Sequence, residues 1–213
     1  MTAIVARERV SQADRREARR QAMMDAALEL FMERGYAGTG ISDVVRRSGG
    51  SLSTFYELFG SKAGLFSAIV QAKSATVVAI FDDPGIDAKS PREALTELGH
   101  RLFALVMGPE GMAAIRAIIL EGAEYPELAD TFFHHGPEVG ETRVAAYLAQ
   151  QTEKGRLKID DPRRAAEQFC ALIRGEFHLR AVCGLPLPLD AETRDRHIDE
   201  TVAMFLRAYT PAG

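Results

Sequence analysis

Apolar residues recur every three to four positions along most of this 213-residue chain, the spacing of one face of an α-helix. The first clear stripe runs through Met23, Ala27, Leu30 and Phe31. No stretch alternates with the two-residue period of a strand for long enough to compete. Because 46% of the residues are hydrophobic, the chain can bury a sizeable core. The sequence therefore predicts an all-α fold.

Glycine and proline mark where the helices should end and begin. Gly35 should end the first helix, and the turn-rich "DDPGIDAKSP" should end the helix that starts at Lys62. We expect a break at "GPEVG" inside one of the later helices. Other helices are expected over residues 41–48, 51–59, 91–107, 111–124, 126–151, 162–183 and 191–209.

Two short helices joined by a glycine-bearing turn lie between Val44 and Phe66. This pattern is typical of a helix-turn-helix, whose second helix enters the major groove of DNA. Ser51, Ser53 and Thr54 would let that helix approach base edges and phosphates closely. Tyr56 and Lys62 could reach phosphates, and Arg46 and Arg47 would flank them. The alternative is an ordinary helical hairpin with polar residues facing water.

The segments "AALELFMERGYAGTGISDVV" and "SGGSLSTFYELFGSKAGLF" resemble the DNA-binding head of the TetR family of bacterial transcriptional regulators. The resemblance covers about residues 16–70. It implies that the residues in contact with DNA are Thr39, Arg46, Gly50, Ser51, Leu52, Ser53, Thr54, Tyr56 and Lys62. Leu52 and Ser53 stand where many members carry a basic residue and then glycine, and Gly40 replaces a hydroxyl residue.

The stretch "LKIDDPRRAAEQFCALIRGEFHLRAVCGLP" resembles the AefR-type C-terminal domain of the same family. This resemblance implies a helical effector-binding domain and a homodimer through helices at about 162–183 and 191–209. We therefore expect a flexible basic arm over 1–15, a helix-turn-helix domain over 16–62 and an effector-binding and dimerisation domain over 63–213. Such a dimer would read a palindrome in double-stranded DNA.

The effector pocket should be lined by apolar residues of the central helices, although each is also a candidate for plain core. Arg116, Glu121, His134 and His178 could add polar specificity, or they could lie on the surface or in satisfied core positions. The candidate lining residues are Phe103, Met107, Ile115, Arg116, Ile119, Phe133, Phe169, Ile173 and Phe177.

The net charge of −4 is unevenly distributed. Residues 1–62 hold ten Lys/Arg against eight Asp/Glu, which fits a basic head and an acidic remainder. The arginines of the leader form either a minor-groove arm or a solvated, frayed terminus. They are Arg7, Arg9, Arg15, Arg16, Arg19 and Arg20.

The sequence lacks the residues that several other classes of function require. Glu97 and His100 form a single E-x-x-H, whereas a di-metal bundle needs two, and no phosphate-loop, metalloprotease or hydrolase motif occurs. We expect no catalytic residues, no metal and no cofactor. Cys170 and Cys183 would lie roughly 20 Å apart on one helix, too far for a disulfide. The sequence contains neither a membrane-spanning run nor a secretory signal, which favours the cytoplasm.

These observations predict a homodimeric transcriptional repressor that a small apolar effector releases from a palindromic operator. Two alternatives remain open. One is a redox-sensing regulator acting through Cys170 or Cys183. The other is a helical ligand-binding protein or enzyme that does not bind DNA.

Overall fold

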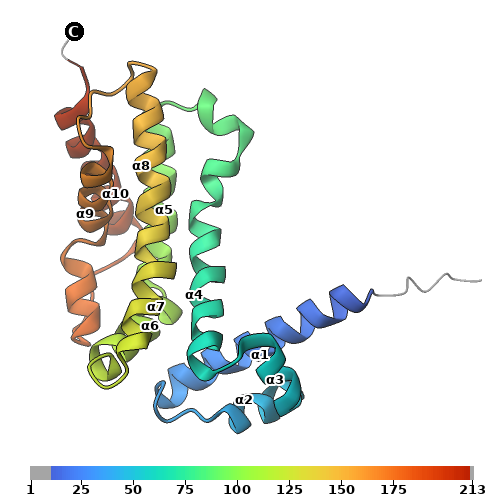
Figure 1. The fold of residues 1–213 in the computed structure, drawn as a ribbon. Helices are drawn as coiled ribbons and strands as arrows, with labels where there is room; N and C mark the ends of the chain where they lie inside the picture. Colours follow the sequence, from blue (N-terminus) through green and yellow to red (C-terminus); the bar gives the residue numbers. More distant parts are fainter. Residues whose placement is uncertain (1–10, 212–213) are drawn as a thin grey trace, which may run out of the picture. The chain divides into compact units, whose positions relative to one another are not determined.

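The computed structural model describes residues 11–211, in which every regular element is a helix and no strand occurs (Figure 1). The prediction of an all-α fold is confirmed. The chain divides into two compact units, Met1–Ala68 and Ile69–Gly213. We call their described parts the head (residues 11–68) and the body (residues 69–211).

The head consists of α1 (Gln12–Arg34), α2 (Ile41–Ser48), α3 (Leu52–Phe59) and the first turns of α4 (Lys62–Val78). The predicted stripe of α1 is buried, and it packs with the fully buried Val44, Phe55 and Leu65. Phe66 stacks edge-on against Tyr36 at a ring distance of 5.8 Å. Because Leu65 and Phe66 belong to this core, the head extends into α4, beyond the expected boundary at residue 62.

Helix α1 begins earlier than the expected boundary at residue 16. Ser11 caps it, because its Oγ accepts a hydrogen bond from the Asp14 N–H and the Asp14 carboxylate accepts one from the Ser11 N–H, both at 3.0 Å. Residues 12–15 of the expected flexible arm are therefore helical. Arg7 and Arg9 lie outside the described residues.

The helices of the body begin mostly at prolines, as expected. Gly136 separates two helices within the predicted 126–151 segment, and the helix expected over 111–124 runs from Pro109 to Glu121. Two short 3-10 segments, Ala79–Asp82 and Pro84–Ala88, precede them. The body helices are α5 (Pro91–Met107), α6 (Pro109–Glu121), α7 (Pro126–His135), α8 (Pro137–Glu153), α9 (Pro162–Val182) and α10 (Ala191–Tyr209).

The core of the body lies where α5 packs against α9 and α10, and where α8 packs against α9. Phe169, Ile173 and Ile198 are completely buried there. Gly99 allows the close approach of α5, since a Cβ at this position would lie 2.8 Å from Ile198 Cγ2. The core is thus built from the apolar stripes that the sequence predicts for these helices.

Helix α9 is interrupted at Gly175, whereas the sequence pattern predicts a continuous helix. Gly175 has φ 53° and ψ −162°, a conformation that side-chain-bearing residues rarely adopt. The interruption is accompanied by a side-chain hydrogen bond from α10, in which His197 Nε2 donates to the Ile173 carbonyl oxygen at 3.0 Å. A side chain of α10 therefore satisfies a main-chain acceptor beside the break.

Between residues 11 and 211, no single helix is long and apolar enough to cross a membrane. Helices α5 and α6, bent by 58° relative to each other, pass the same test of length and composition only as a pair. Buried core helices also satisfy this test, so it is weak support for a membrane span.

Candidate nucleic-acid interface

The turn between α2 and α3 is held tightly against α1. Gly49 ends α2 in the left-handed conformation (φ 70°), and its N–H bonds to the Val45 carbonyl. A Cβ on Gly50 would lie only 2.3 Å from the Met23 Cε, and Met23 is completely buried. The missing side chain of Gly50 thus lets the turn pack on the Met23 side chain of α1, and the contact of Gly50 with DNA stays a prediction.

Two hydroxyls hold the start of α3. Ser51 is the N-cap residue, and its Oγ accepts a hydrogen bond from the Thr54 N–H at 3.1 Å. The Thr54 hydroxyl lies 2.9 Å from the same Oγ. Capping thus accounts for part of the run of small polar residues, and only Ser51 of this pair is exposed.

The outward face of α3 carries Leu52, Ser53, Tyr56 and Glu57. Leu52 and Tyr56 are 47% and 54% exposed, while Phe55 on the opposite face is fully buried. The Ser53 hydroxyl donates to the Glu57 carboxylate at 3.2 Å. Glu57 is not among the residues predicted to contact DNA, although its position one turn after Ser53 places it on the same face. This face could hydrogen-bond with base edges or contact a thymine methyl group.

Lys62 points into the head. Its ammonium donates to the carbonyl oxygens of Tyr36 at 2.7 Å and Thr39 at 3.0 Å. It also lies 4.2 Å from the centroid of the Tyr36 ring, within the range of a cation–π interaction. Lys62 therefore ties the start of α4 to the segment before α2, a different place from the phosphate contact that the sequence suggested.

Thr39 is also part of the structural support. It is 1% exposed, and its hydroxyl donates to the Gly35 carbonyl oxygen at 2.9 Å. A side chain so deeply buried has no surface to offer to DNA in this conformation. The Thr39 side chain thus stabilises the loop between α1 and α2 and, in this conformation, is not available for the predicted DNA contact.

The two arginines of α2 have different surroundings. Arg47 forms a two-pronged ion pair with Glu33 of α1, at 2.7 and 3.1 Å, and this pairing lowers the pKa of the Glu33 carboxyl. Arg46 is 73% exposed and pairs only locally with Asp43, which lowers the pKa of that carboxyl. Arg46 can leave this exposed pair cheaply to meet a phosphate.

The structure thus brings Leu52, Ser53, Tyr56 and Glu57 together on one exposed face. Ser51 lies at the start of that face. Arg46 is exposed at the end of the preceding helix. Thr39 is buried and the Lys62 ammonium points into the head, so these two side chains lie away from that surface.

In the body, the nine pocket candidates do not form one surface. Phe103, Phe169, Ile173 and Phe177 are buried in the core, whereas Ile119 and Phe133 are 60% and 51% exposed. Arg116, itself exposed, donates to the Ala181 carbonyl oxygen at 2.9 Å and so ties α6 to α9. Met107 and Ile115 are half-buried.

The polar candidates of the body differ in their partners. His134 pairs with Glu138 at 2.8 Å on an exposed face, which raises the pKa of the imidazole. Burial lowers the pKa of His178. Among the described residues, neither His178 Nε2 nor Glu121 Oε2 has a hydrogen-bond partner, although both atoms are buried.

No group of three or more His, Cys, Asp or Glu residues that could hold a metal ion occurs within residues 11–211. Burial raises the pKa of the Cys170 thiol to about 12, whereas Cys183 is exposed. Since a peroxide-sensing cysteine must form a thiolate near neutral pH, Cys170 is unsuited to that role.

Both parts of the chain match known family models. Residues 23–69 match the model described as bacterial regulatory proteins, tetR family. Residues 93–211 match the AefR-like transcriptional repressor, C-terminal domain.

Individual proteins show the same similarity. The flavonoid-responsive regulator FrrA is 30% identical, with a TM-score of 0.73, and the match covers 92% of this chain and 100% of that one. A TetR-family regulator from Mesorhizobium loti MAFF303099 has a TM-score of 0.80 at 24% identity, over 92% and 99% of the two chains. The HTH-type regulator YxbF of Bacillus subtilis is 30% identical over 150 residues, which are 69% of this chain but 36% of that protein.

Proposed function

The chain belongs to the TetR family of bacterial transcriptional regulators, and on this premise we propose that it is a homodimeric repressor which a small apolar effector releases from a palindromic operator. Its matched relatives are transcriptional regulators and not enzymes. The observation that carries the proposal is the exposed outer face of α3, held in place by a glycine turn. We place the protein in the cytoplasm, where it would have access to DNA.

Reading of DNA by α3 is supported by the chemistry of its outer face. Ser53 and Tyr56 can donate and accept hydrogen bonds, and Leu52 can contact a thymine methyl group. Glu57 is an acceptor, which suits the amino group of cytosine. Arg46, exposed at the end of α2, would contact a phosphate beside this face.

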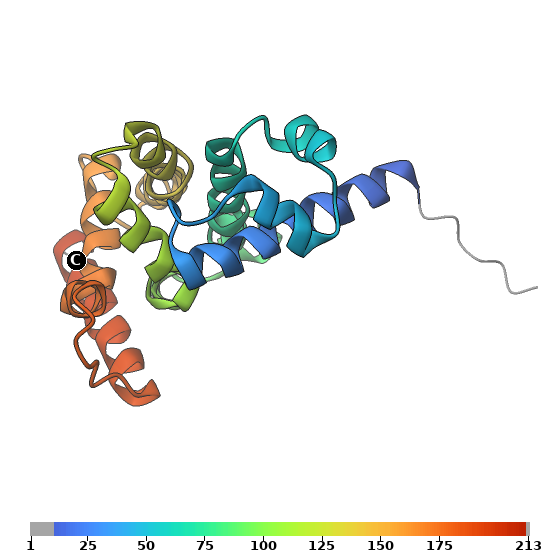
Figure 2. The ribbon, with the colours of Figure 1, turned by 90° about the horizontal axis from the view of Figure 1, so that it is seen from below.

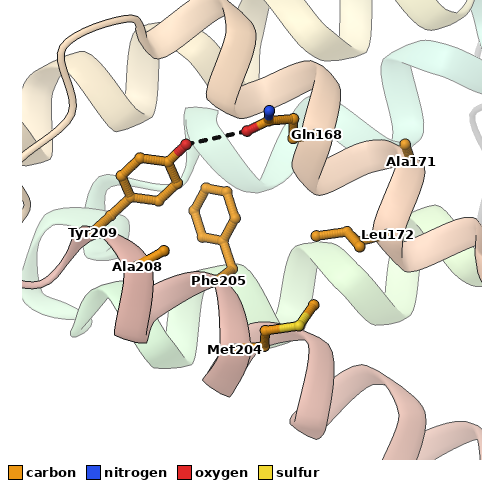
Figure 3. A pocket seen from close by; sticks show the side chains of 7 residues that line it. All are labelled: Gln168, Ala171, Leu172, Met204, Phe205, Ala208 and Tyr209. Carbon is orange, nitrogen blue, oxygen red and sulfur yellow. Dashed lines mark hydrogen bonds between the residues drawn. The ribbon is translucent and has the colours of Figure 1, made fainter.

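Dimerisation through α9 and α10 is supported by an apolar surface that these two helices share. A groove of ≈ 390 Å³ lies between them, and Figure 3 shows the side chains that line it. One edge carries the hydrogen bond from the Tyr209 hydroxyl to Gln168, at 3.1 Å. Leu172 and Met204 in the groove are 37% and 44% exposed. Burial of such a surface against a second copy would stabilise a two-fold dimer. The groove is lined by Gln168, Ala171, Leu172, Met204, Phe205, Ala208 and Tyr209.

A small apolar effector is supported by the relative whose name states such a response, the flavonoid-responsive FrrA. The effector would act by binding better to a body conformation in which the two recognition helices are wrongly spaced for the operator. His178 and Glu121 each carry a buried polar atom with no hydrogen-bond partner among residues 11–211, so we propose them as polar contacts of the effector.

The proposal is tested by titrating the purified protein with duplexes from its own upstream region over a range of salt concentrations. We expect saturable, palindrome-dependent binding with a steep salt dependence. Tyr56→Phe, which removes only a hydroxyl from the outer face of α3, should weaken binding. Tyr125→Phe makes the same chemical change in the body and should not. Equal and weak binding of every duplex by all three proteins would refute the proposal.

The dimer is tested separately by sedimentation. Replacing Met204 with glutamate buries a charge in the proposed interface, so we expect the sedimenting species to become a monomer. A glutamate at Leu120, which is 79% exposed on α6, is the control and should leave the dimer intact. A wild-type protein that sediments as a monomer at the concentration of the DNA titration would refute this part.

A further inference from the structure

The first three turns of α1 stand apart from the core of the head. Residues 12–22 include no buried side chain, and the buried stripe starts only at Met23. Figures 1 and 2 show this part of α1 extending beyond α2 and α3. At 1.5 Å per residue it is about 16 Å long.

Local interactions keep this segment helical without tertiary packing. Ser11 and Asp14 form a capping box at its start. Glu17 pairs with Arg20 one turn later at 3.4 Å, and most other positions carry alanine, arginine or glutamine, which favour helices. The segment is thus a preformed rod whose ordering need not be driven by a partner.

The charge of this rod is mostly unbalanced. Its four arginines face only Asp14, which is used in the cap, and Glu17, which pairs with Arg20. Arg15, Arg16 and Arg19 have no carboxylate partner within residues 11–211, and all three are exposed. Three unpaired guanidinium groups within two turns favour an anionic partner with several charges in a row.

The rod passes the end of the DNA-reading helix. The Arg20 guanidinium lies 6.0 Å from the centroid of the Phe59 ring, and Phe59 is the last residue of α3. Arg20 is only half-buried, so it positions the rod relative to α3 and does not enter the core. The anion nearest to this place, when α3 lies in a groove, is the phosphate backbone.

We propose that residues 12–22 form a rigid arm that binds phosphates of the operator outside the base pairs read by α3. Arg15, Arg16 and Arg19 make the contacts, and Arg20 positions them. This inference rests on the proposed DNA binding. Because a duplex rises about 3.4 Å along its axis for each base pair, an arm of about 16 Å that lies along the duplex reaches up to about 5 base pairs of flanking DNA. The contact is to the backbone, so it should not depend on the flanking sequence.

The test uses the full chain and a palindromic duplex that the wild-type protein selects from a randomised pool. Affinity is measured for this duplex trimmed to the palindrome, and for the same duplex with about 5 added base pairs of arbitrary sequence on each side, the predicted reach of the arm. The test variant carries Arg15→Gln, Arg16→Gln and Arg19→Gln, which keep the helix propensity. The control variant loses the same charge in the body, outside the helices of the proposed dimer interface, through Arg92→Gln, Arg101→Gln and Lys158→Gln.

We expect the added flanks to tighten wild-type binding roughly tenfold at low salt, and the salt dependence to become steeper by about one unit for each phosphate contact. The control variant should gain as much, and the test variant should gain nothing. If flanks leave wild-type affinity unchanged, or help the test variant equally, the arm is refuted while DNA binding stands. If the wild type selects no duplex at all, the proposed function fails and the arm with it.

Discussion

Replacement of Lys62 by methionine separates a structural role from a DNA contact at this position. Methionine keeps an unbranched, flexible apolar stem, so the packing around α4 changes little. The change removes the hydrogen bonds from the ammonium to the Tyr36 and Thr39 carbonyls and its contact with the Tyr36 ring. Because Thr39 is almost completely buried, its carbonyl should find no easy substitute in water.

The expected loss of stability follows from these contacts. A hydrogen bond from a charged donor contributes about 1.5–3 kcal/mol, and a cation–π contact about 0.5–1 kcal/mol. Lys62 is only half-buried, so its ammonium keeps part of its hydration, and we expect a net loss of about 2 kcal/mol. For a chain of this size, that corresponds to a decrease in Tm of about 4–8 °C.

Thermal unfolding followed by far-ultraviolet circular dichroism measures the decrease, and a DNA titration in salt is made on the same proteins. Arg46→Met is the matched control, because Arg46 is exposed and its one ion pair in the described part of the chain is with Asp43, on the same helix. The control should keep its Tm and lose about one unit of salt slope. If Lys62→Met instead keeps its Tm and loses salt slope as the control does, Lys62 contacts a phosphate and its proposed structural role is refuted.

Three further predictions concern the body. Phe169→Ala, at a fully buried ring 5.2 Å from that of Phe205, should lower the free energy of unfolding in urea by about 3–5 kcal/mol, and a loss below about 1 kcal/mol would contradict its core position. Gly175→Ala should lower the free energy of unfolding more than Gly184→Ala does. Both glycines have positive φ, but only at Gly175 would the new Cβ meet a neighbour, His197 Cε1 at 2.9 Å. Equal losses of stability would show that the approach of His197 to Gly175 does not matter. Iodoacetamide at mildly alkaline pH should label Cys183 and spare Cys170, because burial raises the pKa of the Cys170 thiol to about 12; rapid labelling of native Cys170 would reopen the redox alternative.

The fold was largely predictable because its helices end at residues with strong local preferences. The head helices end at glycines, namely Gly35, Gly49 and Gly60. Three body helices begin at the expected prolines, which are Pro91, Pro126 and Pro162. The break at Gly175 escaped prediction because "IRGEFHL" keeps the apolar spacing of a helix on both sides of the glycine. The bond from His197 to the Ile173 carbonyl joins residues far apart in sequence, so no local pattern could reveal it.

The interface was predictable as a location but not residue by residue. Periodicity identifies which helix faces outward, and it correctly separates Phe55 from Tyr56. It cannot show that the Lys62 ammonium turns inward onto two carbonyls, or that Gly50 lies directly against the Met23 side chain. The Lys62 bonds join α4 to the loop between α1 and α2, and Gly50 packs on α1; in each case the partners lie more than twenty residues apart in sequence. Ile119 and Phe133 fit an inward stripe equally well in sequence, and their exposure follows only from how α6 and α7 pack.

Different elements of the head carry the groups suited to base recognition and the positive charge suited to phosphate binding. The outer face of α3 has no positive side chain, and its only charged residue is the carboxylate of Glu57. Such a face can discriminate between bases, but it offers no charge to attract phosphates and one that repels them. The favourable electrostatic part of operator binding must therefore come from outside α3. Within the described head, the exposed arginines that form no close ion pair with another helix include Arg46, Arg15, Arg16 and Arg19, and we expect these to supply it. Substitutions on α3 should thus change which sequence is bound while leaving the salt dependence nearly constant, whereas substitutions of these arginines should do the reverse.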